Sequence, residues 1–442
     1  MHRIVLRHAM VLTMDESDHF HPDGCIVAEN GRITYVGPDA EAVLPQEPFE
    51  ELDFSGKLVM PGLVNTHIHT HSPLFRNLGE DVELHTWLND LMWPAEALLD
   101  AQRAQWGTRL ACLESISNGV TTIADQFYWA DTTAQAVAES GLRAFVCSTI
   151  FADGDASKGQ TLQTAADFIA NWTGRSPLIH PGLGPHAPYS VTAEQWKAVV
   201  ELSERTGAII HTHISETAKE NHDIGQLHGV SPTRWLADLG VLDRHVLAAH
   251  CVHLSDDDIR ILATHDVHVS YNPVSNLKLV SGIMPYGALR KAGVQLSIGT
   301  DGAQSNNTLD LLQDLKVGML IQKQAEKDPT MCDVREAVRL ATISGAQALG
   351  LEDVIGTLEV GKQADLIALD LDSPHFSPLV TGTAKDLYTA LVYCASGRDV
   401  TDTMVSGKWL MRDCSVSSLD RHDIMGKCNE IRYEIQRNLH KE

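Results

Sequence analysis

The chain of 442 residues is too long for one minimal domain and suits one large domain with a smaller companion. Apolar residues make up 43% and charged residues 21%, which is an ordinary globular composition with enough apolar material for a sizeable core. The net charge of −24 argues against non-specific nucleic-acid binding, because that activity needs a basic surface.

Cysteine usage and the apolar runs bear on the cellular compartment. The eight cysteines are scattered and form no C-x-x-C pair, which argues against a disulfide framework in a chain of this size. The opening residues contain no long apolar stretch followed by a small-residue cleavage site. No run approaches the ~18 apolar residues that a membrane span needs. We therefore expect a cytoplasmic protein with neither a membrane nor a nucleic acid as its partner.

The first part of the chain, residues 1–56, has the pattern of short strands separated by turns. Apolar or alternating runs at 4–14, 24–29 and 32–37 are separated by the turn sequences HPDG and ENGR. These features predict a small β-layer.

The middle of the chain, residues 57–355, is more regular. Apolar runs recur, and helical patterns such as 193–207 and 256–266 lie between them. Eight strands that alternate with helices favour a (β/α)8 barrel, an α/β fold whose parallel strands are buried on both faces. The predicted strands are 58–69, 119–126, 143–150, 178–188, 208–215, 245–252, 267–273 and 294–301.

The last part, residues 356–442, is similar to the first. Strands are expected at 364–370 and 402–411, so the two chain ends are predicted to form one β-sandwich that the barrel interrupts. A final helix is indicated by apolar side chains at helical spacing, namely Ile424, Cys428, Ile431, Ile435 and Leu439.

Several barrel runs end in residues that can bind a metal. The first run ends in His67 and His69, the fifth in His213 and the eighth in Asp301. The carboxyl ends of barrel strands face the active site, so these residues converge although they are distant in sequence. His67 and His69 are two positions apart on a strand and therefore point to the same side. Three imidazoles, a carboxylate and a water suit Zn²⁺ or another borderline divalent ion.

Other residues near these strand ends can move protons. Glu216 follows His213 by three residues and can carry protons between a water and a substrate nitrogen. A divalent metal lowers the pKa of its bound water enough to supply hydroxide near neutral pH. His250 and Asp301 can polarise and deprotonate that water.

Each histidine also has a plainer interpretation, because a lone histidine in an apolar strand is more often structural than catalytic. This applies to His186 and His250 taken singly. His71 is followed by Ser-Pro, so we expect it to lie beyond the strand, and His211 is expected to be a satisfied interior residue. The motifs HxH, HxxE and SIGTDG at the ends of separate strands are a stronger signal than any one of them.

Together these motifs resemble those of the amidohydrolase superfamily. Within it, the chain is similar to the branch of methylthioadenosine/S-adenosylhomocysteine deaminases, with triazine chlorohydrolases and guanine deaminases nearby. The resemblance spans almost the whole chain and implies a distorted (β/α)8 barrel beside a β-sandwich built from both chain ends. It rests on PGLVNTHIH, WPAE, GPHAPYS, HISE, HCVHL, NPVSNLKLVSG, SIGTDGAQSNN and GTLEVGKQADLIALD.

The resemblance implies one divalent metal, Zn²⁺ in preference to Fe²⁺. No lysine ends the fourth run, where members with two metals often carry a bridging carboxylated lysine. In the implied roles, Glu216 protonates a ring nitrogen and then relays protons, His250 orients the water, and Asp301 binds the metal and accepts a proton. The implied metal ligands are His67, His69, His213 and Asp301.

The resemblance also implies substrate contacts for His186, in GPHAPYS, and for Glu96, whose counterpart in adenosine-type members contacts ribose hydroxyls. Trp87 is a candidate stacking wall, and Ser305 matches a position near the purine. From the residues alone, Trp87 is equally well a core side chain and Glu96 a solvated charge on a helix.

One departure from the family pattern concerns the far end of the substrate. Some members bind it with arginines after the third strand, but no arginine occurs between Arg143 and Arg175. Lys158 is the candidate substitute. The departure disfavours a carboxylate-bearing substrate such as S-adenosylhomocysteine and leaves adenosine or methylthioadenosine more open.

Three functions are therefore to be compared. The first is hydrolytic deamination of an adenine nucleoside or thionucleoside, with release of ammonia. The second is the same chemistry on guanine, a pterin, cytosine or a triazine. The third is a non-catalytic scaffold, which the complete set of expected ligands disfavours. The sequence leaves the oligomeric state open, a homo-oligomer included.

Overall fold

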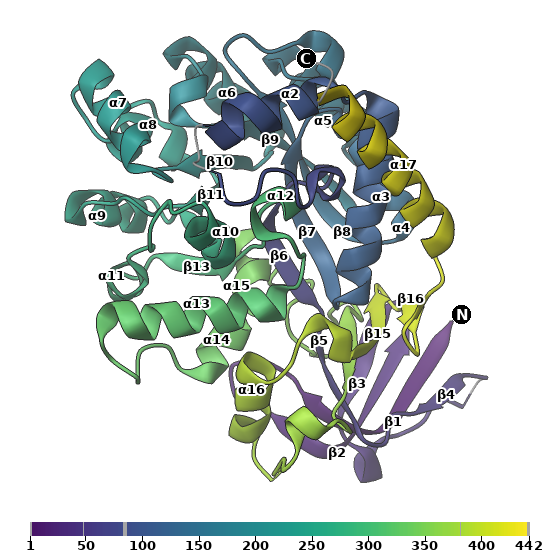
Figure 1. Cartoon of the computed structure of the whole chain (residues 1–442). Helices are drawn as coiled ribbons and strands as arrows, with labels where there is room; N and C mark the ends of the chain where they lie inside the picture. The colour runs from purple at the N-terminus through teal and green to yellow at the C-terminus, as the bar shows by residue number, and fades with distance from the viewer. Residues whose placement is uncertain (1, 47, 83–85, 381, 440–442) are drawn as a thin grey trace.

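The structure, a computed structural model, describes residues 2–46, 48–82, 86–380 and 382–439. Its central feature is a parallel eight-stranded sheet that curls into a barrel (Figure 1), in agreement with the predicted (β/α)8 fold. The strands follow one another in chain order around the barrel: β6 (Leu63–Ile68), β7 (Val120–Phe127), β8 (Arg143–Ile150), β9 (Ile179–Pro185), β10 (Ile210–Ile214), β11 (Val246–His250), β12 (His268–Tyr271) and β13 (Gln295–Ile298).

Bonds between the first and last strands bring the two edges of this sheet together. The hydroxyl of Thr66 donates to the carbonyl of Ile298 at 2.9 Å, and the Asp301 N–H donates to the carbonyl of His67 at 2.9 Å. Every residue of β7 and β8 is buried, as expected for strands covered on both faces. The barrel is therefore a packed core whose polar residues gather at its carboxyl end.

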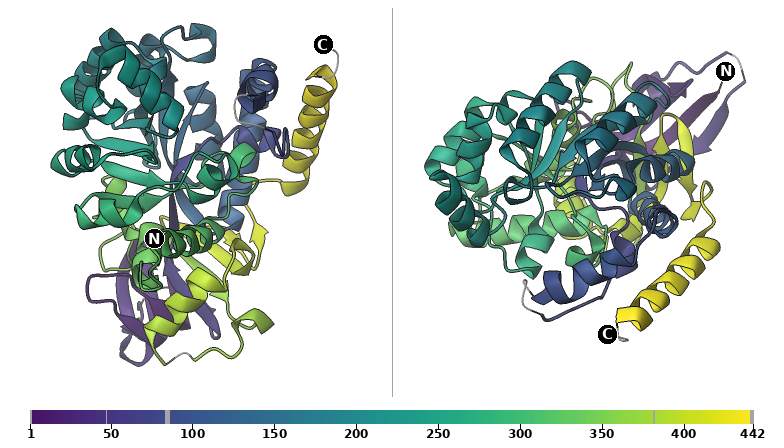
Figure 2. Two further views of the ribbon diagram at one scale, coloured as in Figure 1. Left: turned by 60° about the vertical axis from the view of Figure 1, so that its left-hand side comes forward. Right: turned by 90° about the horizontal axis from the view of Figure 1, so that it is seen from above.

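The chain ends form a second, mixed sheet that lies below the barrel (Figure 2). Its strands run in the order β17–β16–β15–β14–β5–β1–β2–β3, and β4 pairs in parallel with β1. The strands are β1 (Arg3–Leu12), β2 (Phe20–Glu29), β3 (Arg32–Pro38), β4 (Glu50–Asp53), β5 (Lys57–Pro61), β14 (Leu366–Asp370), β15 (Val400–Val405), β16 (Lys408–Arg412) and β17 (Ser415–Val416). This confirms the prediction that both ends build one β-layer.

The predicted strand 58–69 is two strands in the structure. The chain leaves the mixed sheet after β5 and enters the barrel with β6, and Gly62 lies between them. A Cβ at Gly62 would lie 2.2 Å from the Thr121 side chain, so only glycine fits at this crossing. An uninterrupted apolar run does not reveal that it serves two sheets. The division of the chain at 56/57 and 355/356 stays a prediction.

Helices cover the outside of the barrel, and the predicted helices at 193–207 and 256–266 are present as α6 and α9. The helices are α2 (Trp93–Ala97), α3 (Ala101–Ser117), α4 (Ala130–Ser140), α5 (Leu162–Trp172), α6 (Ala193–Thr206), α7 (Ala218–His228), α8 (Pro232–Asp238), α9 (Asp256–Thr264), α10 (Pro273–Lys278), α11 (Tyr286–Lys291), α12 (Ala303–Asn306), α13 (Leu311–Glu326), α14 (Val334–Leu340), α15 (Ile343–Ala348), α16 (Ala384–Tyr393) and α17 (Arg421–Leu439).

The final helix, α17, confirms the prediction from helical spacing. Its buried residues are Ile424, Cys428, Ile431 and Ile435. They pack in one apolar cluster with Phe75, Trp87 and Leu113, so α17 lies against α3 on the outer wall of the barrel rather than on the β-layer (Figure 2). No helix in the described part of the chain is long and apolar enough to cross a bilayer.

A buried ion pair joins the barrel to the mixed sheet. Arg143, at the start of β8, lies 3.1 Å from the Asp365 carboxylate, and the two side chains are only 4% and 2% exposed. Asp365 also accepts the Ser406 N–H at 2.7 Å, which ties the β15–β16 turn to the same point. Buried charges persist only when paired in this way.

We predict that Arg143→Met lowers the free energy of unfolding by about 3–5 kcal/mol, because it leaves the Asp365 carboxylate buried without its counter-ion. Urea unfolding followed by circular dichroism measures this change. Arg234→Met is the control, since the Arg234–Asp257 pair has side chains 40% and 51% exposed and should contribute below about 1 kcal/mol. Equal destabilisation by the two variants would contradict the prediction.

Candidate metal and catalytic site

The carboxyl ends of the barrel strands bring the predicted ligands together. His67 lies near the end of β6 and His69 just beyond it, His213 lies on β10, and Asp301 follows β13 by three residues. One donor atom from each of His67, His69 and His213 lies within 4.8 Å of the others, and the same holds for His67, His250 and Asp301. The Asp301 Oδ1 atom lies 3.4 Å from His67 Nε2 and 3.3 Å from His69 Nε2.

The hydrogen bonds of two of these histidines fix which ring nitrogen is free. His69 Nδ1 lies 2.6 Å from the carbonyl of Gln126, and His213 Nδ1 lies 2.7 Å from the carbonyl of His186. A carbonyl only accepts, so each Nδ1 carries the proton and donates it. Each Nε2 is therefore left with a lone pair, which is the form that binds a metal.

One ring nitrogen of His67 is buried without a hydrogen-bond partner in the described part of the chain. Its ring is fully buried, and its Nε2 has no hydrogen-bond partner among the described residues. Burial holds the pKa of His67 well below its ordinary value, so the ring is neutral. A buried, neutral imidazole nitrogen without a partner is costly unless it binds an ion.

His211 is closer to the site than the sequence indicated. Its Nε2 lies 2.9 Å from His67 Nδ1, while its own Nδ1 has no partner among the described residues. The expectation that His211 is a fully satisfied interior histidine is therefore wrong. With His67 Nε2 free for a metal, His67 Nδ1–H donates to His211 and fixes the orientation of the ligand ring.

Asp301 is held in position by short bonds on both oxygens. Oδ1 accepts the Gly302 N–H at 2.7 Å, and Oδ2 accepts the hydroxyls of Ser275 and Ser305 at 2.5 and 3.1 Å. Burial opposes ionisation of Asp301, but its contacts with His67 and the neighbouring histidines outweigh burial and hold the pKa of Asp301 well below its usual range. The donor set of three imidazoles and one carboxylate fits Zn²⁺ and related divalent ions.

Glu216 and His250 form a second pair beside this cluster. His250 Nε2 lies 3.8 Å from Glu216 Oε2, and the Ser281 hydroxyl donates to Glu216 Oε1 at 3.3 Å. Burial, and then the charge of Asp301, raise the pKa of Glu216 to about 7, although His213 and Ser281 oppose the shift. A carboxyl with this pKa can both take up and release a proton near neutral pH.

His250 is oriented by an amide that the sequence did not identify. The Asn276 Nδ2 lies 2.9 Å from His250 Nδ1, so the amide donates and the imidazole proton is on Nε2, facing Glu216. Burial lowers the pKa of His250 to about 4, and the ring is neutral. His250 also has a φ of +75° and Cys251 a φ of +50°, a left-handed turn that aims the ring into the barrel mouth.

His186 and Glu96 border the cluster on one side. The His186 ring lies 4.9 Å from that of His213 and stacks on Phe151 at 4.7 Å, and its Nδ1 contacts the Ser190 hydroxyl at 2.9 Å. Glu96, on α2, accepts a bond from the Tyr128 hydroxyl at 3.4 Å. The Tyr128 and Phe151 rings are 6.0 Å apart, so these contacts form one continuous arc from His213 to Glu96.

The remaining predicted residues lie nearby but contact other groups. Trp87 is 7% exposed and packs in the apolar cluster under α17, as the core interpretation expected. The Ser305 hydroxyl bonds to the metal-side carboxylate of Asp301. His71 lies beyond β6 as expected, stacks on Phe127, and has its Nε2 4.0 Å from Glu96 Oε1. Contacts of Trp87 and Ser305 with a substrate remain predictions.

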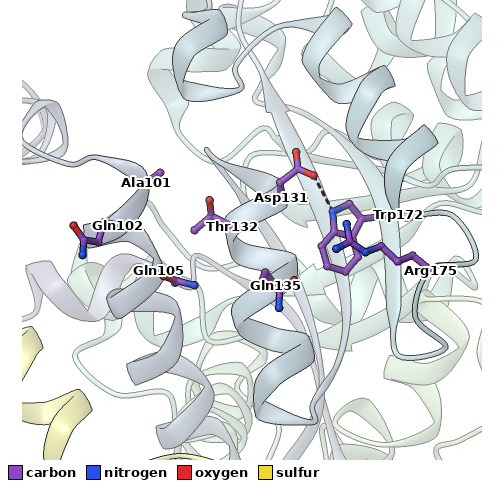
Figure 3. Close-up of a pocket in the computed structure, with 8 residues that line it drawn as sticks. All are labelled: Ala101, Gln102, Gln105, Asp131, Thr132, Gln135, Trp172 and Arg175. Carbon is purple, nitrogen blue, oxygen red and sulfur yellow. Dashed lines mark hydrogen bonds between the residues drawn. The ribbon is translucent and has the colours of Figure 1, made fainter.

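A cavity of about 380 Å³ on the outer wall does not belong to this site. It lies between α3, α4 and α5 (Figure 3) and is lined by glutamines, Asp131, Trp172 and Arg175. Its one carboxylate, Asp131, accepts the Trp172 indole N–H at 2.9 Å, and the Arg175 guanidinium lies over the Trp172 ring. The described side chains that line this cavity form no group of metal ligands.

Comparisons of sequence show the family to which the chain belongs. The sequence model of the Amidohydrolase family matches residues 58–410. A 5-methylthioadenosine/S-adenosylhomocysteine deaminase from Desulforudis audaxviator is 40% identical over 424 residues, which cover 96% of each chain. A 5′-deoxyadenosine deaminase from Methanosarcina barkeri is 40% identical over 434 residues, or 98% of each chain.

A comparison of structures also finds similarity to a deaminase. The crystal structure of an adenosine deaminase from Xanthomonas campestris with bound zinc superimposes with a TM-score of 0.93 at 32% sequence identity. The match covers 98% of each chain, so it includes both the barrel and the β-layer.

We predict that His67→Ala removes the metal, because His67 Nε2 is a buried nitrogen that lies beside Asp301 Oδ1 and has no hydrogen-bond partner among the described residues. His71→Ala should leave the metal content near that of the wild type, since His71 lies beyond the strand and beside Glu96. Metal per chain is measured by inductively coupled plasma mass spectrometry after purification without chelators. Loss of the metal from His71→Ala, or its retention in His67→Ala, would contradict the assignment.

Proposed function

This chain belongs to the amidohydrolase family, and from that premise we propose that it is a hydrolytic deaminase of adenine nucleosides with a small substituent at the 5′ position. The substrate is an adenosine, 5′-deoxyadenosine or 5′-methylthioadenosine type of molecule, and ammonia leaves from C6 of the ring.

The observation that carries this proposal is the position of Glu216. Its carboxyl, with a pKa of about 7, lies between His250 Nε2 and the Ser281 hydroxyl at the edge of the ligand cluster. Removal of an amino group from an aromatic ring needs such a residue, because the ring nitrogen next to the reacting carbon must be protonated as water attacks. We assign Glu96 and the neighbouring rings of Tyr128 and Phe151 to the side of the site that would bind the ribose.

His67, His69, His213 and Asp301 are the residues that would hold the metal. When bound, a divalent metal lowers the pKa of a coordinated water and so supplies a nucleophile near neutral pH. We take the metal to be zinc, which is bound in the similar adenosine deaminase and suits three imidazoles and a carboxylate.

The chain's own residues then move the protons. Glu216 takes one proton from the attacking water and delivers it to the ring nitrogen beside C6. His250 donates its Nε2–H to the attacking oxygen and orients it. Asp301 accepts the second proton as the C–N bond breaks, and the leaving amino group takes up that proton and departs as ammonia. The products are a 6-oxopurine nucleoside and ammonia, so the oxygen and both hydrogens of water are accounted for.

Substrate orientation is assigned to the arc from His186 to Glu96. The Tyr128 hydroxyl lies 3.4 Å from Glu96 Oε2, and His71 Nε2 lies 4.0 Å from Glu96 Oε1. A carboxylate in this setting can accept two vicinal hydroxyl groups, which a ribose presents. His186 Nδ1 contacts the Ser190 hydroxyl and its ring lies beside that of His213, so we assign His186 Nε2 to contact the substrate ring.

The protein segment assigned to the far end of the substrate favours a small 5′ group. The segment between β8 and α5 presents Phe151 and Lys158 but no guanidinium to bind an amino-acid carboxylate. Phe151 stacks on His186 and neighbours Tyr128, and an apolar 5′ substituent suits these rings. The similarity to a 5′-deoxyadenosine deaminase agrees with this assignment.

We predict ammonia release from adenosine, 5′-deoxyadenosine and 5′-methylthioadenosine, and slower turnover of S-adenosylhomocysteine. A coupled ammonia assay, with chromatographic detection of the 6-oxopurine product, measures kcat/KM for each compound on zinc-loaded protein. Glu216→Gln should lower kcat by about 10²–10⁴-fold, because it removes the proton carrier. Absence of turnover with all of these substrates would refute the proposal.

We predict that Glu96→Ala lowers kcat/KM for adenosine by about 10²-fold, as expected for loss of hydrogen bonds to a charged group. The matched substrate is 2′,3′-dideoxyadenosine, which lacks the ribose hydroxyls. Wild type and Glu96→Ala should deaminate it at similar, low efficiency. If Glu96→Ala lowers kcat/KM equally for both substrates, Glu96 does not bind the ribose hydroxyls. A free heterocycle such as guanine or a triazine then becomes the better candidate substrate.

A further inference from the structure

Glu220, on α7, is bonded to the turn that carries Glu216. Its Oε1 accepts the Ser215 N–H at 2.9 Å and its Oε2 accepts the Glu216 N–H at 2.9 Å. The residue is 4% exposed. Both oxygens of a buried carboxyl are thus devoted to two successive backbone amides, one of which belongs to the proton carrier itself.

The turn that Glu220 holds is a strained one. Ser215 has a φ of +51°, in the left-handed region that costs an L-residue roughly 1–2 kcal/mol. Its carbonyl accepts the N–H groups of Val252 and His253 at 3.1 and 2.9 Å. The Ser215 N–H and carbonyl are therefore both held by hydrogen bonds that favour this backbone conformation.

The same network reaches the other end of Glu216. His253 Nε2 donates to the carbonyl of Ser281 at 2.6 Å, and the Ser281 hydroxyl donates to Glu216 Oε1 at 3.3 Å. Asn221, next to Glu220 on α7, donates to the carbonyl of His253 at 2.5 Å. Two adjacent residues of one helix thus fix both the main chain of Glu216 and the loop that binds its side chain.

We propose that Glu220 is a positioning residue that holds the main chain of Glu216, so that its carboxyl reaches both the attacking water and the substrate ring nitrogen. This inference rests on the proposed function. Glu216 must serve two atoms in one cycle, and a displacement of about 1 Å can cost 10²-fold in rate. A turn that is braced by a carboxyl on α7 holds Glu216 in this geometry better than an unbraced loop would.

An ordinary helix cap does not account for these bonds. At the start of α9, Asp258 accepts the N–H of its own N-cap residue, Ser255, at 2.9 Å. The N-cap residue of α7 is Thr217, yet Glu220 reaches past it to the amides of Ser215 and Glu216. Asp258 is equally buried and occupies the same helix position after the next strand, so it is a matched comparison.

The test compares Glu220→Gln with Asp258→Asn in the full zinc-loaded chain. In Glu220→Gln an amide NH₂ faces a backbone N–H, which breaks one of the two bonds. Amide hydrogen exchange at Ser215 and Glu216 should accelerate in Glu220→Gln and stay unchanged in Asp258→Asn. On the best adenine nucleoside substrate, Glu220→Gln should lower kcat by about 10–100-fold with KM and zinc content nearly unchanged. Asp258→Asn should stay within about twofold.

A double variant separates positioning from general stability. Glu216→Gln/Glu220→Gln should be no slower than Glu216→Gln alone, because Glu220 acts only through Glu216. Unchanged exchange at the two amides, a Glu220→Gln rate equal to that of Asp258→Asn, or a double variant slower than Glu216→Gln would overturn the inference. The exchange measurement needs no turnover, so it decides the backbone role even if adenine nucleosides are not the substrates.

Discussion

The hydrogen bond from the Asp301 N–H to the carbonyl of His67 is the constraint on which the site depends. This bond joins the first strand of the barrel to the loop after the last strand. Closure of the barrel therefore also places the proposed ligands His67 and Asp301 side by side. Asp301 adopts a φ of +60° to make this bond, and its carboxylate then meets His67 and His69 Nε2 at 3.4 and 3.3 Å. The cost of that backbone conformation is offset by bonds that exist only in the closed barrel.

Burial sets the protonation states that the chemistry requires. His67 and His250 are kept neutral because desolvation lowers the pKa of an imidazole, and neutral rings are what a metal and an oriented water need. The same burial raises the pKa of both Glu216 and Glu96 to about 7. The roles proposed for them differ because their neighbours differ: Glu216 faces His250 and Ser281, whereas Glu96 faces Tyr128 and His71.

Much of this arrangement follows from the sequence. Apolar runs that end in His67, His213, His250 and Asp301 predict strands, and the rule that barrel sites lie at carboxyl ends predicts that these residues meet. The supporting bonds could not be predicted in this way. His211 contacts His67 across the barrel, and Asn276 contacts His250 from a helix between two later strands, so neither partner has a fixed sequence spacing. The division of the first apolar run into β5 and β6 at Gly62 could not be predicted either, because the close contact there is with Thr121, which is distant in sequence.

The charges at the barrel mouth bear on which substrates the proposed site can bind. The protein is strongly acidic, and Asp301, Glu216 and Glu96 gather around the barrel mouth. A substrate carboxylate entering here meets like charges and, between β8 and α5, Lys158 rather than an arginine pair. A bidentate guanidinium binds a carboxylate in a fixed geometry, whereas a lysine acts as a point charge. Under the proposed function, an uncharged purine nucleoside with an apolar 5′ group would avoid this repulsion and would pack on the rings of Phe151 and Tyr128, which lie 6.0 Å apart.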